Sequence, residues 1–170
     1  MSTQGNSHIR TVYVTGLRNA HALEHEAINI IDRQLERLDD YPEVRERLRL
    51  HRGETEQQIV RLEEVLGALG ESQSGLKDAA LSVMGNMAAL SHAIADDEIL
   101  KNSFANCALE NFEIASYKSL ITMAQAGGFQ GGVSALEASL REEQEMARWC
   151  EQSIEQITTR YLSLRQNVDA

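Results

Sequence analysis

Six ionisable residues of this sequence stand at positions where an amphipathic helix would turn their side chains toward a protein core. They share the three- or four-residue spacing of the apolar residues around them, and they are Glu24, His51, Glu54, Glu110, Glu113 and Glu143. A buried carboxylate without a partner is costly, and several gathered together would mostly take up protons unless cations neutralised them. Oxygen-rich sites with an imidazole suit iron or manganese, and carboxylates can bridge two divalent ions. The pattern therefore predicts a buried metal site.

Chance has to be weighed against this prediction, because the chain carries 26 acidic residues and some of them must fall in phase with apolar neighbours. Such glutamates would simply be solvated on broad helices. However, each of four long helical segments supplies an inward acid, and two of them carry a pair of ionisable residues three positions apart. This coincidence favours the site. Glu142 stays open as the alternative to its neighbour Glu143, because adjacent residues are rotated by about 100° around a helix.

Apolar residues recur every three or four positions along most of the chain, which is the period of an amphipathic helix. The single proline and the few aromatic residues argue against β-sandwiches and barrels. Pro42 suits the first turn of a helix, and the paired glycines Gly127 and Gly128 suit the end of one. The pattern predicts an all-α protein with long helices over residues 11–38, 42–67, 97–127 and 133–164, and an additional helix over residues 76–95.

The connections between these segments predict the topology. Short connections join the first helix to the second and the third to the fourth, so each of these pairs should be antiparallel. The second connection is long enough to cross the bundle. This is a ferritin-like four-helix bundle with the additional helix in the crossover. We expect one domain over residues 11–165, between a flexible N-terminal tail of residues 1–10 and a C-terminal tail of residues 166–170.

Composition narrows the expected partners and compartment. The formal net charge of −10 leaves no basic stripe for a phosphate backbone, so nucleic acid is not an expected partner. No segment reaches the length and apolarity of a membrane span, and the uncharged residues 79–95 are expected to lie in the core or at the contact of a homodimer. The two cysteines, Cys107 and Cys150, and the lack of a secretory leader predict reduced thiols in a cytoplasmic protein.

Short motifs spread over nearly the whole chain resemble the bacterial YciE/YciF stress proteins. They are ALEHEAI around Glu24, HRGET from His51, QIVRLEEVL from Gln58, LENFEIASY from Leu109 and LREEQEMA from Leu140. The segments DDYPEVRERL before the second helix, DEIL from Asp97 and REEQEMARW near the end are most similar to the YciE branch. That family is ferritin-like and associated with stress responses. The resemblance implies a metal site at Glu24, Glu54, Glu110, Glu113 and Glu143, together with His51.

The resemblance and the helical phase together assign roles to these ligands. Glu54 and Glu143 would bridge two ions per chain, iron or manganese, and the other ligands would cap them: Glu24, Glu110, Glu113 and His51. The expected function is a di-metal protein that acts on peroxide or oxygen during stress. The chain departs from the rubrerythrin pattern, because Gln57 and Met146 stand three residues after Glu54 and Glu143, where that pattern has histidine. The alternative is therefore a structural or interaction protein whose bundle holds one ion or none.

Two other signals are set aside. His21-Ala22-Leu23-Glu24-His25 has the spacing of an inverted zinc-protease motif, in which two histidines hold zinc and the glutamate serves as base. The absence of strand-forming segments for a catalytic domain, and the use of Glu24 as a metal ligand, argue against a protease. His21 is then expected at most to contact a ligand of the site, and His25 to face solvent. Cys107, one turn before Glu110, is interpreted as a core residue instead of a redox-active one.

Overall fold

The structure is a computed structural model that describes residues 3–71 and 97–166. Within these ranges the chain forms four long helices, a single turn of 3-10 helix and no strand, which confirms the all-α prediction. The helices are α1 (Thr3–Leu35), α2 (Pro42–Ala68), α4 (Glu98–Gly127) and α5 (Val133–Gln166), and the 3-10 turn η2 is Gln130–Gly132. The helix expected over residues 76–95 and the dimer contact expected there lie outside the described residues, so both stay predictions.

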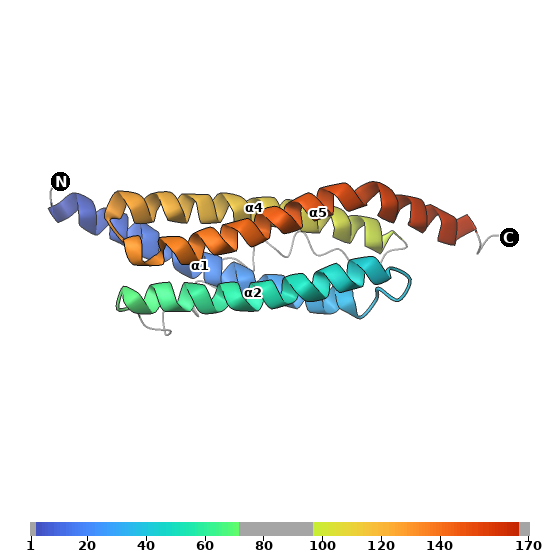
Figure 1. Cartoon of the computed structure of the whole chain (residues 1–170), viewed down its shortest axis with the longest axis horizontal. Coiled ribbons are helices and arrows are strands. Elements are labelled where there is room, and N and C mark those ends of the chain that lie inside the picture. Colours follow the sequence, from blue (N-terminus) through green and yellow to red (C-terminus); the bar gives the residue numbers. More distant parts are fainter. Residues whose placement is uncertain (1–2, 72–96, 167–170) are drawn as a thin grey trace.

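The four helices form a bundle of two antiparallel pairs (Figure 1). α1 packs along α2, and α4 packs along α5, while α1 also contacts α4 and α2 contacts α5. α2 and α4 run in the same direction, so the end of α2 and the start of α4 lie at opposite ends of the bundle (Figure 1). The one long connection, between α2 and α4, therefore joins opposite ends, as the ferritin-like topology requires.

Proline and glycine residues stand at the helix ends where the sequence predicts them. Pro42 occupies the first turn of α2, where its missing N–H costs nothing. Gly128 directly follows the last residue of α4, and its φ of +78° is the left-handed conformation that glycine adopts without strain. The backbone N–H of Phe129 then donates to the Ala124 carbonyl at 2.8 Å, and the chain turns through η2 into α5. Gly132 lies against α2, where an added Cβ would come within 2.8 Å of Val65.

The limits of α1 differ from the predicted ones. The helix begins at Thr3 instead of residue 11 and ends at Leu35 instead of residue 38. Within the additional residues at the start of the helix, the Arg10 guanidinium donates to the Leu69 carbonyl and pairs with Glu71, both at 2.7 Å. Because these partners are distant in the sequence, no local pattern of apolar residues predicts the contacts. At the other end, Leu38 is buried but lies in a turn after the helix, where its carbonyl accepts a hydrogen bond from the Tyr41 N–H.

Two large apolar clusters lie toward the two ends of the bundle with a polar layer between them, and a third, smaller cluster consists of Leu23, Ala27 and Leu109. One cluster gathers the apolar residues of the end where α1 begins, including Tyr13, Leu17, Leu62, Leu120 and Leu136. The other gathers those of the opposite end, including Ile31, Leu48, Met146, Cys150 and Ile157. Between them in every helix stand the buried charged residues Glu24, His51, Glu110, Glu113 and Glu143. The two clusters supply the hydrophobic stabilisation that allows the layer between them to be polar.

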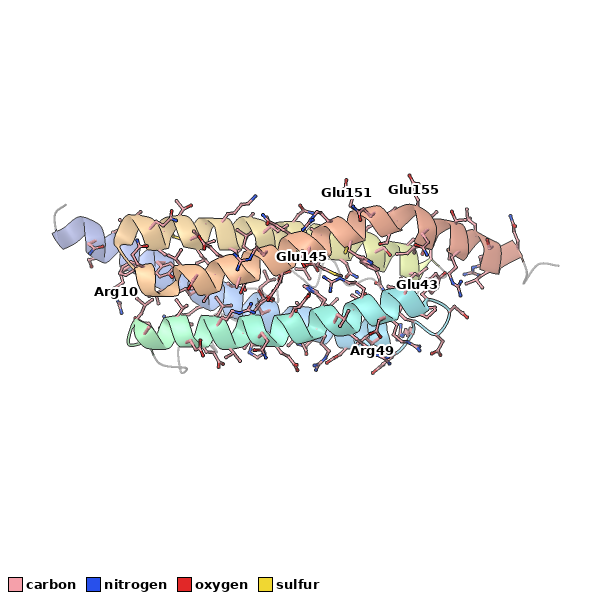
Figure 2. All side chains as sticks on the ribbon, in the orientation of Figure 1. Arg10, Glu43, Arg49, Glu145, Glu151 and Glu155 are labelled. Carbon is pink, nitrogen blue, oxygen red and sulfur yellow. The ribbon has the colours of Figure 1, made fainter. Side chains whose placement is uncertain are left out.

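Charged side chains cover the outside of the bundle. Labelled examples that point away from the core in Figure 2 are Glu43, Arg49, Glu151 and Glu155, all of them exposed. Among the helices that the structure describes, none is both long and apolar enough to cross a membrane.

Candidate metal centre in the polar layer

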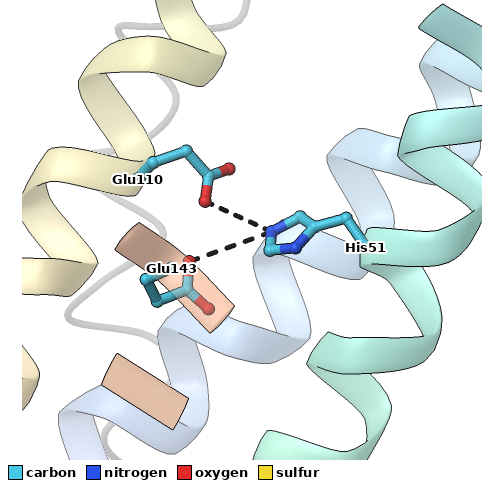
Figure 3. Close-up of side chains that lie close together, drawn as sticks. All are labelled: His51, Glu110 and Glu143. Atoms are coloured by element: carbon cyan, nitrogen blue, oxygen red, sulfur yellow. Dashed lines mark ion pairs between the residues drawn. The ribbon is translucent and has the colours of Figure 1, made fainter. Parts of the chain in front are cut away.

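Three buried residues from three helices converge at the centre of the polar layer (Figure 3). His51 of α2, Glu110 of α4 and Glu143 of α5 each place a ligand atom within 4.8 Å of the other two. The Nε2 atom of His51 lies 3.2 Å from a Glu110 oxygen and 3.8 Å from a Glu143 oxygen. A nitrogen and two carboxylate oxygens at these separations are a donor set that a divalent cation can bind.

Glu24 of α1 and Glu113 of α4 bring two more buried carboxylates to this layer. Each of these side chains is almost completely shielded from solvent. Glu24 accepts a hydrogen bond from the Tyr117 hydroxyl at 2.6 Å. The charges of Glu24, Glu110 and Glu143 all act on the carboxyl group of Glu113. The layer therefore receives at least one acid from α1, α4 and α5 and an imidazole from α2.

Four carboxylate oxygens of the layer are buried without a hydrogen-bond donor among the described residues. They are Glu24 Oε2, Glu110 Oε2, Glu113 Oε1 and Glu143 Oε2. Two of them, Glu110 Oε2 and Glu143 Oε2, lie 3.2 and 3.8 Å from the His51 Nε2 atom, which is close enough for ion pairs. Buried acceptors are nearly always hydrogen-bonded in folded proteins. The single charge of His51 cannot balance all of these carboxylates when they are ionised, so a further positive partner would stabilise the layer.

Burial and mutual repulsion oppose ionisation of the layer in the absence of such a partner. Burial raises the pKa of Glu24 to about 8, against an opposing hydrogen bond from Tyr117. Burial and the charges of neighbouring carboxylates raise the pKa of Glu113 and of Glu143 well above the ordinary value. Without a cation, the layer must hold protons at neutral pH to relieve these costs.

His51 responds in the opposite direction. Burial by itself lowers the pKa of His51, but the adjacent acids Glu110, Glu54 and Glu143 outweigh burial and raise the pKa to about 10. The imidazole therefore carries a proton and a positive charge in the metal-free protein, where it partly compensates the acids. A metal ligand must be neutral imidazole, so a bound ion would have to displace this proton.

Glu54 is the one predicted ligand that the structure does not bring into this group. Its side chain is 29% exposed, and its Oε2 contacts the His51 Nδ1 atom at 2.9 Å and Arg47 at 3.1 Å. Glu54 therefore contacts the Nδ1 side of the His51 ring, whereas Glu110 and Glu143 lie on the Nε2 side. The hydrogen bond from His51 lowers the pKa of Glu54 and keeps it ionised. This is the position of a residue that orients His51, because the partner of one ring nitrogen fixes what the other can do.

The structure also separates the two candidate acids of α5. Glu143 is fully buried in the layer, while the side chain of Glu142 is 24% exposed. Both oxygens of Glu142 pair with the Arg61 guanidinium, at 2.6 and 2.7 Å. The geometry therefore assigns Glu143 to the candidate site and Glu142 to an ion pair beside it.

Gln58 and Tyr117 belong to the layer although the sequence analysis did not select them. Gln58 is fully buried, and its amide nitrogen donates to Glu143 and, at 3.1 Å, to Glu142. Neither residue ionises near neutral pH, so a search for acids and histidines passes over both. Helical phase carries a usable signal for Gln58, because a residue seven positions after His51 lies within about 20° of it around the helix.

Comparisons with known proteins place the chain in a group without an assigned activity. Residues 8–163 match the model of a protein family described as a domain of unknown function, DUF892. A solved protein of Xanthomonas campestris is 29% identical to this chain, with a TM-score of 0.78 and coverage of 94% of this chain and 99% of that one.

Two more distant structures have the same fold. The E. coli stress protein YciF is 20% identical, with a TM-score of 0.70 and coverage of 94% of this chain and 99% of that one. YcfI of Rhodopseudomonas palustris is 23% identical, with a TM-score of 0.67 and coverage of 84% and 92%. The family match and these folds confirm the resemblance to the YciE/YciF type and the four-helix bundle.

Proposed function

Because the chain belongs to the DUF892 family, whose description assigns no activity, we propose a function from its own polar layer: it binds divalent transition-metal ions inside the bundle. The observation that carries this proposal is the set of four buried carboxylate oxygens that receive no hydrogen bond from the described residues, two of which share the single charge of His51. A cation would satisfy these acceptors and remove the repulsion among the acids.

The donor set fits iron or manganese better than zinc. Four carboxylates and one imidazole form an oxygen-rich environment, whereas structural zinc sites favour sulfur and nitrogen. Glu24, Glu110, Glu113, Glu143 and His51 would hold the metal, and five side chains are enough for a pair of ions that share carboxylates. We propose two iron or manganese ions per chain. When bound, such ions supply redox chemistry toward oxygen or peroxide.

Neighbouring side chains of the same bundle would orient these ligands. Tyr117 fixes one oxygen of Glu24, so the other oxygen is left for an ion. Gln58 does the same for Glu143, and Glu54 holds the His51 ring through Nδ1. Each of these contacts leaves a ligand atom directed into the layer, which lowers the entropic cost of binding an ion.

A stress-associated role is the wider proposal, since YciF, which shares the fold, is described as a stress protein. A structural role for the ions is the second candidate. It is favoured by the presence of one histidine among the described residues of the layer, where peroxide-reducing enzymes of the rubrerythrin type use two. Consumption of hydrogen peroxide by the iron-loaded protein would favour the redox role, and metal-dependent stability without peroxide consumption would favour the structural role.

Melting temperature and metal content test the proposal together. Metal that binds only the folded state stabilises it by about 2.7 kcal/mol at a hundredfold excess over the dissociation constant. We expect Mn²⁺ or Fe²⁺ to raise the melting temperature of the intact protein, and Glu143→Gln to reduce both this rise and the bound metal. Glu145→Gln, an exposed change on the same helix, serves as the matched control and should behave as wild type. Equal metal content in wild type and Glu143→Gln would contradict the proposed site.

A further inference from the structure

The residues of the histidine motif of α1, His21 to His25, face two different parts of the bundle. Glu24 is buried in the polar layer, whereas His21 and His25 lie together on the side of α1 that meets α2. The division follows from helical geometry, because residues four positions apart share a face and the glutamate one position before His25 is rotated away by about 100°. The Glu24 carboxylate is buried and accepts a hydrogen bond from Tyr117, so it is already engaged in the polar layer instead of standing beside the two histidines as a base.

A carboxylate of the neighbouring helix takes its place. The His21 Nε2 atom lies 3.2 Å from an oxygen of Glu63, which α2 presents opposite α1. The His21 and His25 rings meet edge to face, with their centroids 4.6 Å apart. Two imidazoles and one carboxylate from two antiparallel helices are therefore close neighbours at one point on the bundle surface.

The three side chains differ in their exposure to solvent in a way that suits binding of an ion from solution. The His21 side chain is only 7% exposed, so packing holds its ring in place. Glu63 is 36% exposed, and His25 is exposed, so solvent ions reach the group directly. The backbone presents both histidines on one face, and His25 would have to rotate about its own side-chain bonds to direct a nitrogen toward an ion beside His21 and Glu63.

We propose that His21, His25 and Glu63 form a second metal site, separate from the polar layer, that binds zinc. Two histidines spaced by four residues on a helix and a glutamate from elsewhere in the fold make a zinc donor set that leaves the fourth position to water. This surface site is richer in nitrogen than the polar layer, so the two sites should select different ions. Since its ligands come from α1 and α2, a bound ion would also fasten this pair of helices together.

The test measures zinc binding to the full-length protein by calorimetry, on a Glu143→Gln background that weakens the polar layer. We expect one zinc ion per chain, and His25→Ala should weaken binding by about 10- to 100-fold or more, the range that loss of an outer-shell partner already causes at metal sites. His8→Ala is the matched control, because His8 is an exposed histidine of the same helix. It should bind as the parent does.

A second readout separates this site from general attraction of zinc to an acidic surface. Cobalt substitutes for zinc, and its visible absorption reports nitrogen coordination in a low-coordinate site. We expect an intense band in the Glu143→Gln protein that His25→Ala and Glu63→Gln both remove. Unchanged zinc affinity in His25→Ala, or an equal loss in His8→Ala, would overturn the proposal. Failure here leaves the polar layer untouched, because that site is tested separately with manganese or iron.

Discussion

The metal-free protein should lose stability as the pH rises, and Glu24 is the residue through which this is most directly tested. Burial raises the pKa of Glu24 from its ordinary value of 4.5 to about 8 in the folded protein. Between these two values the folded state retains a proton that the unfolded state releases. The unfolded state therefore binds fewer protons, and the free energy of unfolding falls with pH.

The size of the effect follows from the shift. One proton bound only by the folded state changes the free energy of unfolding by about 1.4 kcal/mol per pH unit. Between about pH 5 and about pH 7.5, Glu24 alone should then cost about 3 kcal/mol. Glu113 and Glu143 are shifted in the same direction and add to the loss. His51 also contributes, because its pKa is raised to about 10, so stability that is fully present below its unfolded value is lost as the pH rises toward 10.

Urea unfolding at a series of pH values, in the presence of a chelator, measures this slope. Glu24→Gln is the informative variant, because its amide oxygen still accepts the Tyr117 hydrogen bond but the side chain no longer titrates. Its stability should fall less steeply, by up to about 1.4 kcal/mol per pH unit. Glu145→Gln, an exposed glutamate, should keep the wild-type slope. Stability that rises from pH 5 to pH 7.5 in the metal-free wild type, or an identical slope in Glu24→Gln, would refute the reasoning.

Two further predictions concern residues outside the polar layer. Burial raises the pKa of the thiols of Cys107 and Cys150, so alkylation of both thiols in the native protein should be slow, and slower at the buried Cys150 than at Cys107. Mass spectrometry of labelled peptides measures these rates, and rapid labelling of Cys150 would contradict the prediction. Gly128→Ala should destabilise the protein by about 1–2 kcal/mol in urea unfolding, because alanine is strained at a φ of +78°, and a neutral effect would mean that the end of α4 adopts another conformation.

The sequence predicted most of the fold because its signals are local. Pro42 and Gly128 mark helix ends through their own backbone preferences, and both act at the predicted places. The first residues of α1 carry few apolar residues, and the contact of Arg10 there is with Glu71, 61 residues away, which no local pattern reveals. The short connections fixed which helices are antiparallel neighbours, and the long second connection indicated that α2 and α4 are parallel.

The candidate site was predicted less completely, for a geometric reason. Three residues after His51, Glu54 is rotated by about 60° from it around the helix, while seven residues after His51, Gln58 is rotated by about 20°. Glu54 therefore reaches the edge of the layer and Gln58 its interior. Helical phase therefore explains why Glu54 contacts Arg47 and the outer nitrogen of His51, whereas Gln58 reaches Glu143. The role of Glu54 as a metal ligand stays a prediction. Glu143 is buried, as its phase with Leu140 and Ala147 on the same helix predicts, and its role as a ligand stays a prediction.

Anomalous diffraction from crystals grown with Mn²⁺ tests the central claim most directly, because it locates the metal without any assumption about activity. The account predicts strong manganese peaks among Glu24, Glu110, Glu113, Glu143 and His51, and the loss of these peaks in Glu143→Gln. A wild-type map with no peak in the polar layer, at a manganese concentration that raises the melting temperature, would contradict it.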